Sequence, residues 1–154
     1  MPDIQVQAED KIAEVIRGMQ LAWPPAAQIT TGRLPWNVQG DGTVVIYPGI
    51  RIYPLRPQFG QGTNQREDVG YGVGIAWICP ADHFTSEMRD RVSSGRALVR
   101  RRIVEDCFDQ LPLVTGAVYL STKIGDTEVN LPKEAHRYEV SGLAAYCWVR
   151  ESRT

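Results

Sequence analysis

Large and small residues alternate along residues 68–79, and this pattern predicts a long β-strand. One face of that strand carries the large side chains of Val69, Tyr71, Val73, Ile75 and Trp77. The other face carries only small residues, namely Gly70, Gly72, Gly74 and Ala76. Glycine in a strand interior loses backbone entropy and packs no side chain. Three glycines on one face therefore indicate that a helix or another subunit lies almost against the strand backbone.

Two segments have the apolar period of a helix. The first covers residues 3–20, with Asp3 as a plausible N-cap and Trp23-Pro24-Pro25 as the stop; its stripe is Ile12, Val15, Ile16 and Met19. The second region runs from near Thr85 to Leu111, with a break expected at residues 93–95. After that break one face is apolar, with Val99, Ile103, Cys107 and Leu111.

Further strands are expected at residues 44–47, 50–53, 117–120 and 137–150. Residues 26–41 are expected to form a loop, and residues 124–130 an irregular excursion. The glycine-rich, polar segment 59–66 predicts a long, mobile hairpin arm. This order of elements predicts an α+β fold, in which an N-terminal helix and a second helix pack on one face of a mainly antiparallel β-sheet. Residues 1–154 then form a single domain with a protruding arm around 55–67.

Composition narrows the class of protein. Apolar residues make up 43% of the chain and charged residues 23%, with a net charge of -1. These values are ordinary for a soluble globular protein, and they argue against a dedicated DNA-binding protein, which would need a basic field. We expect neither a signal peptide nor a transmembrane helix, so the protein is expected to be made in the cytoplasm. The three cysteines are expected to be free and buried: Cys79, Cys107 and Cys147.

No catalytic constellation is visible in the sequence. The glycines of residues 70–74 alternate inside a strand, so their N–H groups are committed to the sheet and cannot cradle a phosphate. His83 and His136 lack partners at metal-ligand spacing, and Cys79 with His83 would be only half of a zinc site. Cys107 lies on an apolar helix face, which favours a core position over a nucleophile. We therefore expect no enzymatic activity, no metal and no cofactor.

The second helix also carries a basic group, Arg96, Arg100, Arg101 and Arg102. One interpretation is a solvated helix face whose partners are nearby carboxylates. The other is an electrostatic contact with an acidic partner subunit or with nucleic acid passing nearby. The solvated face is preferred, and both interpretations remain open. Among the aromatic residues, Trp77 and Trp148 are expected in the core, whereas Phe59 in the polar arm is a candidate intermolecular anchor.

With this order of elements, the chain resembles the tail terminator (tail completion) proteins of long-tailed bacteriophages. The features that match are an amphipathic helix at 12–19, a proline-flanked strand at 44–53, a strand after an arm at 69–78 and a helix at 95–111. The last strand completes the set with Tyr138, Val140, Gly142, Tyr146 and Trp148. The resemblance extends over nearly the whole chain.

The resemblance implies a structural virion protein in the tail or neck. It implies a homo-oligomeric ring, a hexamer, on the end of the tail tube. This ring would stop polymerisation of the tube and join the tail to the head connector. The partners would be other copies of the chain, the tail tube protein and the head–tail connector proteins, with DNA passing through the lumen without sequence-specific binding and with no membrane. We expect the subunit interface to include Phe59, Gly70, Gly72, Gly74, Arg96 and Arg100.

Two alternatives stay open. One is another neck or tail component, such as a head-closure or tube-like subunit. The other is a small cytosolic enzyme or ligand-binding domain with a pocket under the arm.

Overall fold

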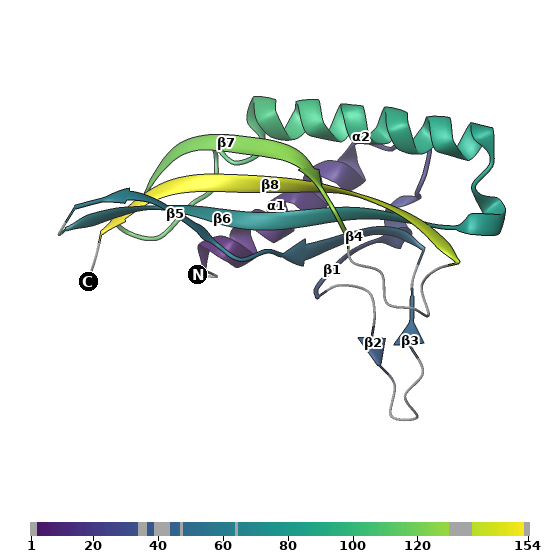
Figure 1. Ribbon diagram of the computed structural model, residues 1–154. Coiled ribbons are helices and arrows are strands. Elements are labelled where there is room, and N and C mark those ends of the chain that lie inside the picture. Colours follow the sequence, from purple (N-terminus) through teal and green to yellow (C-terminus); the bar gives the residue numbers. More distant parts are fainter. Residues whose placement is uncertain are drawn as a thin grey trace.

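A long sheet with helices on one of its faces is the framework of the computed structural model (Figure 1). The structure describes residues 3–33, 37–38, 44–46, 48–63, 65–129 and 137–152. The helices are α1 (Ile4–Gly18) and α2 (Ser86–Asp106), with short 3-10 turns at Ala26–Gln28 and Ala81–His83. The strands are β1 (Ile29–Thr31), β2 (Asn37–Val38), β3 (Val44–Val45), β4 (Gly49–Pro54), β5 (Gln58–Gly62), β6 (Arg66–Pro80), β7 (Val118–Thr127) and β8 (Tyr138–Ser152). This confirms the predicted α+β fold class.

The two longest strands form the centre of the sheet. β6 and β8 pair antiparallel over their whole length, from Arg66 opposite Ser152 to Pro80 opposite Tyr138. The strand order is β1-β4-β6-β8-β7, and β5 pairs with β6 on the same side as β4. Only β1 runs parallel to its neighbour, β4. The strand expected at 50–53 is β4, which pairs with β1 and β6. The strand expected at 44–47 is the two-residue β3, which pairs with β2 and not with β4. Tyr47 lies outside the described residues.

The main core lies between the helices and one face of the sheet, which we call the helix face. β6 contributes Val73, Ile75 and Trp77 to it, the large side chains of the predicted alternation. β8 contributes Leu143 and Ala145, which lie opposite Ile75 and Val73, together with Cys147 and Val149. Both α1 and α2 bury their apolar residues in this same cluster, and α2 runs along the top of the sheet in Figure 1. Successive side chains of a strand point to opposite faces of the sheet, so the alternation of large and small residues in β6 places its large side chains on the helix face.

Helix α1 forms as its sequence predicts. The Asp3 carboxylate accepts a hydrogen bond from the Val6 N–H at 2.8 Å and so caps the first turn. Ile4, Ala8, Ile12 and Ile16 are buried on the sheet, while Val15 and Met19 are only partly buried. The helix also bonds directly to the sheet, since the Gln5 side-chain amide donates to the Gly72 carbonyl of β6 at 2.9 Å.

Helix α2 is continuous from Ser86 to Asp106, so the expected break at residues 93–95 is wrong. Gly95 lies on the buried side of the helix, in line with Val92, Val99 and Ile103. A Cβ on Gly95 would come within 3.7 Å of the indole nitrogen of Trp77. That is an ordinary van der Waals distance, so Gly95 neither ends the helix nor is required for its packing on the sheet. Thr85 caps the helix by accepting from the Met88 N–H at 3.2 Å.

The opposite face of the sheet, which we call the glycine face, is covered by aromatic side chains of the same chain. A Cβ built on Gly74 would lie 2.2 Å from the Tyr53 ring, and one on Gly70 would lie 2.8 Å from the Trp148 ring. A Cβ on Gly72 would meet the Tyr146 ring at 2.8 Å. The expected cover by a helix or another subunit is wrong, because rings from the neighbouring strands β4 and β8 already lie over the bare backbone.

Two segments are more regular than their sequences indicated. β7 extends to Thr127, so much of the expected excursion at 124–130 is strand. The expected loop at 26–41 contains β1, which adds a parallel strand to the sheet. In the part of the chain that the structure describes, no helix is both long and apolar enough to cross a membrane.

The covered glycine face predicts a sharp contrast between two glycines. We expect Gly74→Ala to lower the free energy of unfolding by about 1–3 kcal/mol, because its methyl group would overlap the buried Tyr53 ring. Gly125→Ala in β7 is the matched control: nothing lies within 4 Å of its Cβ position, so stability should be unchanged or higher by about 0.5–1 kcal/mol. Urea denaturation of both variants measures the difference, and equal stabilities would contradict this account of the face.

Candidate subunit interface

The six residues expected at a subunit interface lie in three different parts of the molecule. Gly70, Gly72 and Gly74 are buried on the glycine face beneath Trp148, Tyr146 and Tyr53. Arg96 and Arg100 lie on α2, above the helix face. Phe59 lies in β5, at the left end of the sheet in Figure 1. The structure therefore does not bring the six together into one surface.

The two arginines differ in what they contact. Arg96 donates to the Asp126 carboxylate of β7 at 2.7 Å and to the Gly142 carbonyl of β8 at 3.2 Å. Its side chain is only 27% exposed, so it ties the helix to two strands of its own chain. Arg100 is exposed and has no ion pair among the described residues. Of the two, only Arg100 is available to a partner.

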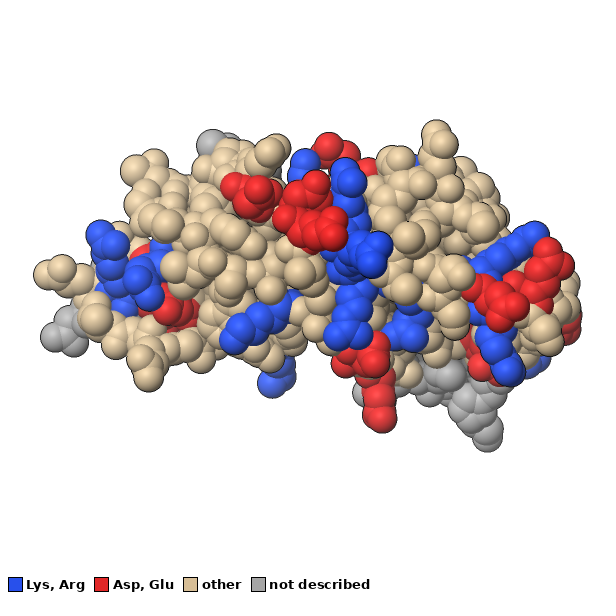
Figure 2. Space-filling view, turned by 90° about the horizontal axis from the view of Figure 1, so that it is seen from above, with Lys and Arg blue, Asp and Glu red and all other residues tan. Residues whose placement is uncertain are grey.

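Two other arginines of α2 pair with carboxylates of the same helix. Arg91 pairs with Glu87 at 2.6 Å and Arg102 with Asp106 at 3.1 Å, each one helical turn apart. Figure 2 shows a band of basic side chains across the middle of this side of the molecule, flanked by acidic ones. The preferred interpretation of the arginine group, a solvated helix face with intrahelical partners, holds for Arg102.

Phe59 is the most exposed of the large apolar side chains that are described, at 64%. It belongs to a β-hairpin: β5 pairs with β6, and the Thr63 N–H donates to the Arg66 carbonyl at 2.7 Å to close the turn. Where the sequence predicted a mobile arm, the chain forms a paired strand whose five residues are all exposed. The ring of Phe59 is thus presented on a regular element.

Two unpaired sheet edges lie at the same level as Phe59. One transverse row of the sheet runs from Phe59 in β5 through Val69 and Val149 to Tyr119 in β7. β5 has no described strand on its outer side, and neither does β7. The end of the sheet near the hairpin therefore has four strands and two open edges, one on each side.

β5 and the first half of β7 lack the charges that normally guard such edges. No charged residue occurs in residues 57–65 or in residues 110–122. Exposed edge strands usually carry lysine or other charges that prevent pairing with a second chain. Here the β7 edge instead exposes Val118 at 53% and Leu120 at 39%. Sequence reasoning missed β7 as an interface candidate, although the charge-free run was a signal that could have found it.

Charges near this end of the sheet are paired inside the chain. The Arg150 guanidinium donates to Asp68 at 2.8 Å, and this hydrogen bond lowers the pKa of the Asp68 carboxyl. The Tyr71 hydroxyl donates to the Glu151 carboxylate, and burial together with this bond raises the pKa of Tyr71. Of these charges, Asp68 and Arg150 neutralise each other, which lowers the electrostatic cost of approach by another copy.

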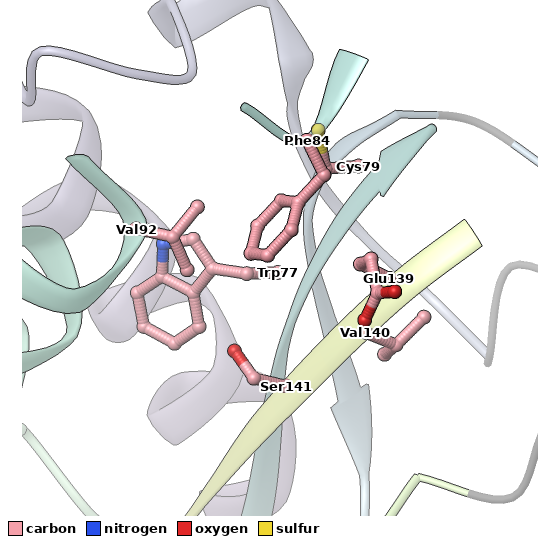
Figure 3. A pocket seen from close by; sticks show the side chains of 7 residues that line it. All are labelled: Trp77, Cys79, Phe84, Val92, Glu139, Val140 and Ser141. Carbon is pink, nitrogen blue, oxygen red and sulfur yellow. The ribbon is translucent and has the colours of Figure 1, made fainter. Parts of the chain in front are cut away.

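Hollows of about 80 to 540 Å³ open on the described part of the molecule. The most enclosed one measures about 80 Å³ and lies between α2 and the sheet (Figure 3). Trp77, Phe84 and Val92 form its apolar wall, and the Ser141 hydroxyl points toward the Trp77 ring. Ligand pockets for drug-sized molecules are typically about 300–1,000 Å³. This cavity has room for a few waters, which could satisfy the otherwise unpartnered Ser141 oxygen.

The hairpin has a wider hollow of about 320 Å³ where a pocket under the arm was expected as one alternative. Its lining includes Arg66 together with Asp68 and Arg150, which pair with each other. No group of three or more metal-ligating side chains occurs in the described ranges. His83 ends the short turn after β6, while His136 and Trp36 lie outside the described residues.

The cysteines are free and buried, as the sequence predicts. Burial raises the pKa of the Cys107 and Cys147 thiols to about 12, and it also raises the pKa of Cys79. A thiol acts as a nucleophile only as the thiolate, so these groups stay unreactive near neutral pH.

In comparisons with known proteins, no family model matches the chain and no curated protein matches it. The functional argument therefore depends on the fold, the edges and the exposed residues described above.

The different contacts of the two arginines predict different roles. We expect Arg96→Ala to lower the free energy of unfolding by about 1–2 kcal/mol, because a charged hydrogen bond to a partly buried carbonyl is lost. Arg100→Ala, the matched control, should stay within about 0.5 kcal/mol of the parent. Urea denaturation measures both changes. If Arg100→Ala proved the more destabilising change, the assignment of Arg96 as an internal tie would be wrong.

Proposed function

We propose that the chain is a structural virion protein of the tail terminator kind, which forms a ring on the end of a phage tail tube. In that role it stops tail polymerisation and joins the tail to the head connector. The proposal begins from the resemblance in the order of elements, and the α+β fold with both helices on one sheet face agrees with what that resemblance implies.

The observation that carries the proposal is the pair of open, uncharged edges at one end of the sheet. β5 and β7 are different strands on opposite sides, so a contact between them joins unlike surfaces of two copies. Such contacts repeat from copy to copy and end only when the series closes into a ring. A protein that acted alone would have little use for two unguarded edges.

The charge distribution is compatible with the proposed partners. The net charge of -1 provides no general attraction for DNA, which suits a lumen through which DNA passes without being held. Arg100 on α2 is exposed and could contact an acidic surface of a tail or neck protein. We expect six copies in the ring, as the resemblance implies.

A head-closure or tube-like subunit is the main alternative, because such a protein could use the same edges. The difference is in stacking, since tube subunits assemble into many rings and a terminator into one. An enzyme or ligand-binding domain is the weaker alternative, because the hollow at the hairpin is lined by Asp68 and Arg150, which already pair with each other.

Native mass spectrometry over a range of protein concentrations, with electron microscopy of the same samples, tests the proposal. We expect a cyclic species, six-membered by resemblance, that appears as single rings and binds the end of isolated tail tubes. Long tubes of stacked rings would favour the tube-like subunit. A two-fold dimer as the only assembled species would contradict the ring.

A further inference from the structure

We propose that neighbouring copies join through β5 of one copy and the first half of β7 of the next, so that their sheets become continuous. This inference rests on the proposed ring, and it identifies the second copy of the chain as the occupant of both open edges. The argument uses strand direction, strand level and the absence of charge.

Strand direction permits the pairing. β5 and β8 both run antiparallel to β6, and β7 runs antiparallel to β8. β7 therefore points opposite to β5. When two copies stand side by side with their helices on the same side, β7 of one and β5 of the next are antiparallel, and they can form the commoner kind of β-ladder.

Strand level favours a closed ring. Phe59 and Tyr119 occupy the two ends of one transverse row, through Val69 and Val149. Copies can therefore join with no shift along the strands, which a closed ring requires, because a shift repeated at every contact would climb into a helical filament. In this arrangement the exposed Phe59 ring lies beside Tyr119 and Leu120 of the next copy.

Each edge also limits how long the ladder can be. The pairing of β5 with β6 shifts between Phe59 and Gly62, and the pairing of β7 with β8 shifts between Tyr119 and Ser121. Bulges of this kind bend a strand and interrupt its hydrogen-bonding edge. The seam is therefore a short ladder in which side chains such as Phe59 and Leu120 supply much of the contact.

A two-fold pairing of β7 with β7 of a second copy is the competing arrangement. In the register centred on Lys123, near the middle of β7, the two Lys123 side chains would lie directly opposite each other. Like charges directly opposite one another destabilise a strand pair. That arrangement would also leave β5 and the Phe59 ring uncovered. The pairing of unlike edges avoids both costs.

Engineered cysteines test the seam directly, because the native cysteines are buried. The variants are Phe59→Cys, Leu120→Cys and the double variant, each oxidised mildly at a concentration at which rings form. Within one chain β5 and β7 are separated by three strand spacings, roughly 14 Å, which is too far for a disulfide. Any disulfide between these positions must therefore join two copies.

We expect the double variant to give a ladder of disulfide-linked species that ends at the size of the ring. Neither single variant should cross-link alone, whereas a mixture of the two should give linked dimers. The matched control is Phe59→Cys with Leu98→Cys, since Leu98 is 51% exposed but lies on α2. That control should remain uncross-linked.

The outcomes separate the seam from the ring itself. Dimers from Leu120→Cys alone would place Leu120 beside Leu120 of a second copy and would overturn the seam. Rings without any cross-link in the double variant or the mixture would overturn the seam while leaving the proposed function standing. The absence of any ring at any concentration would overturn the proposed function and the seam together.

Hydrogen exchange on the unmodified protein provides a measurement that does not depend on the variants folding. Amides in residues 58–62 and 118–122 should exchange at least tenfold more slowly in the ring than in the free subunit. Equal exchange in the two states at these residues, with slowing elsewhere, would also overturn the seam.

Discussion

The antiparallel pairing of β6 with β8 is the constraint on which the rest of the structure depends. Fifteen residues of each strand are in register, which at about 3.4 Å per residue makes a ribbon roughly 50 Å long. This register places the large residues of β6 beside those of β8 and so defines the helix face. It also determines that Trp148 and Tyr146 lie over Gly70 and Gly72. A shift by one residue would exchange the two faces of the ribbon.

Different helices bond to the sheet at the two ends of this ribbon. Near the hairpin, the N-terminal turns of α1 bond to the sheet through Gln5 and to the turn before β7 through Gln7, whose side-chain oxygen accepts from the Leu113 N–H at 3.0 Å. Leu113 has a positive φ of 56°, and this bond contributes to holding it there. At the other end, α2 is tied to β7 and β8 by Arg96. The two helices thus position β7 from both ends.

Local sequence patterns predicted the elements whose signal is strong and periodic. The alternation in residues 68–79 gave the strand and its packed face, and Asp3 with the apolar stripe gave α1. The pattern failed where one residue type has two uses. Gly95 was interpreted as a helix breaker, but it lies inside a continuous helix, on the side that faces Trp77. β7 was predicted too short, because after Leu120 only Ile124 of this edge strand is a large apolar residue packed against the core, which makes the apolar signal weak.

The candidate interface, too, could be predicted only in part from local sequence. The exposure of Phe59 could be predicted, since an aromatic residue in a polar, glycine-rich segment has no local partner. The cover of the glycine stripe could not, because it depends on which strand lies beside β6 and in which register. The common level of the β5 and β7 edges depends on three strand pairings at once. No local reading of residues 57–65 or 110–122 contains that information.

The uncharged edges have a consequence for the life of the free subunit. A sheet end that recruits another copy through backbone groups does so regardless of whether a tail is present, so the risk of misassembly rises with the concentration of unassembled chain. Synthesis in small amounts, or rapid consumption by growing tails, would keep that concentration low. The interrupted ladders at Phe59 and Leu120 act in the same direction, because a seam of few hydrogen bonds dissociates readily until a ring is complete. Wrong contacts between copies that form reversibly can come apart again, whereas a long flat edge would hold together the first two copies that met.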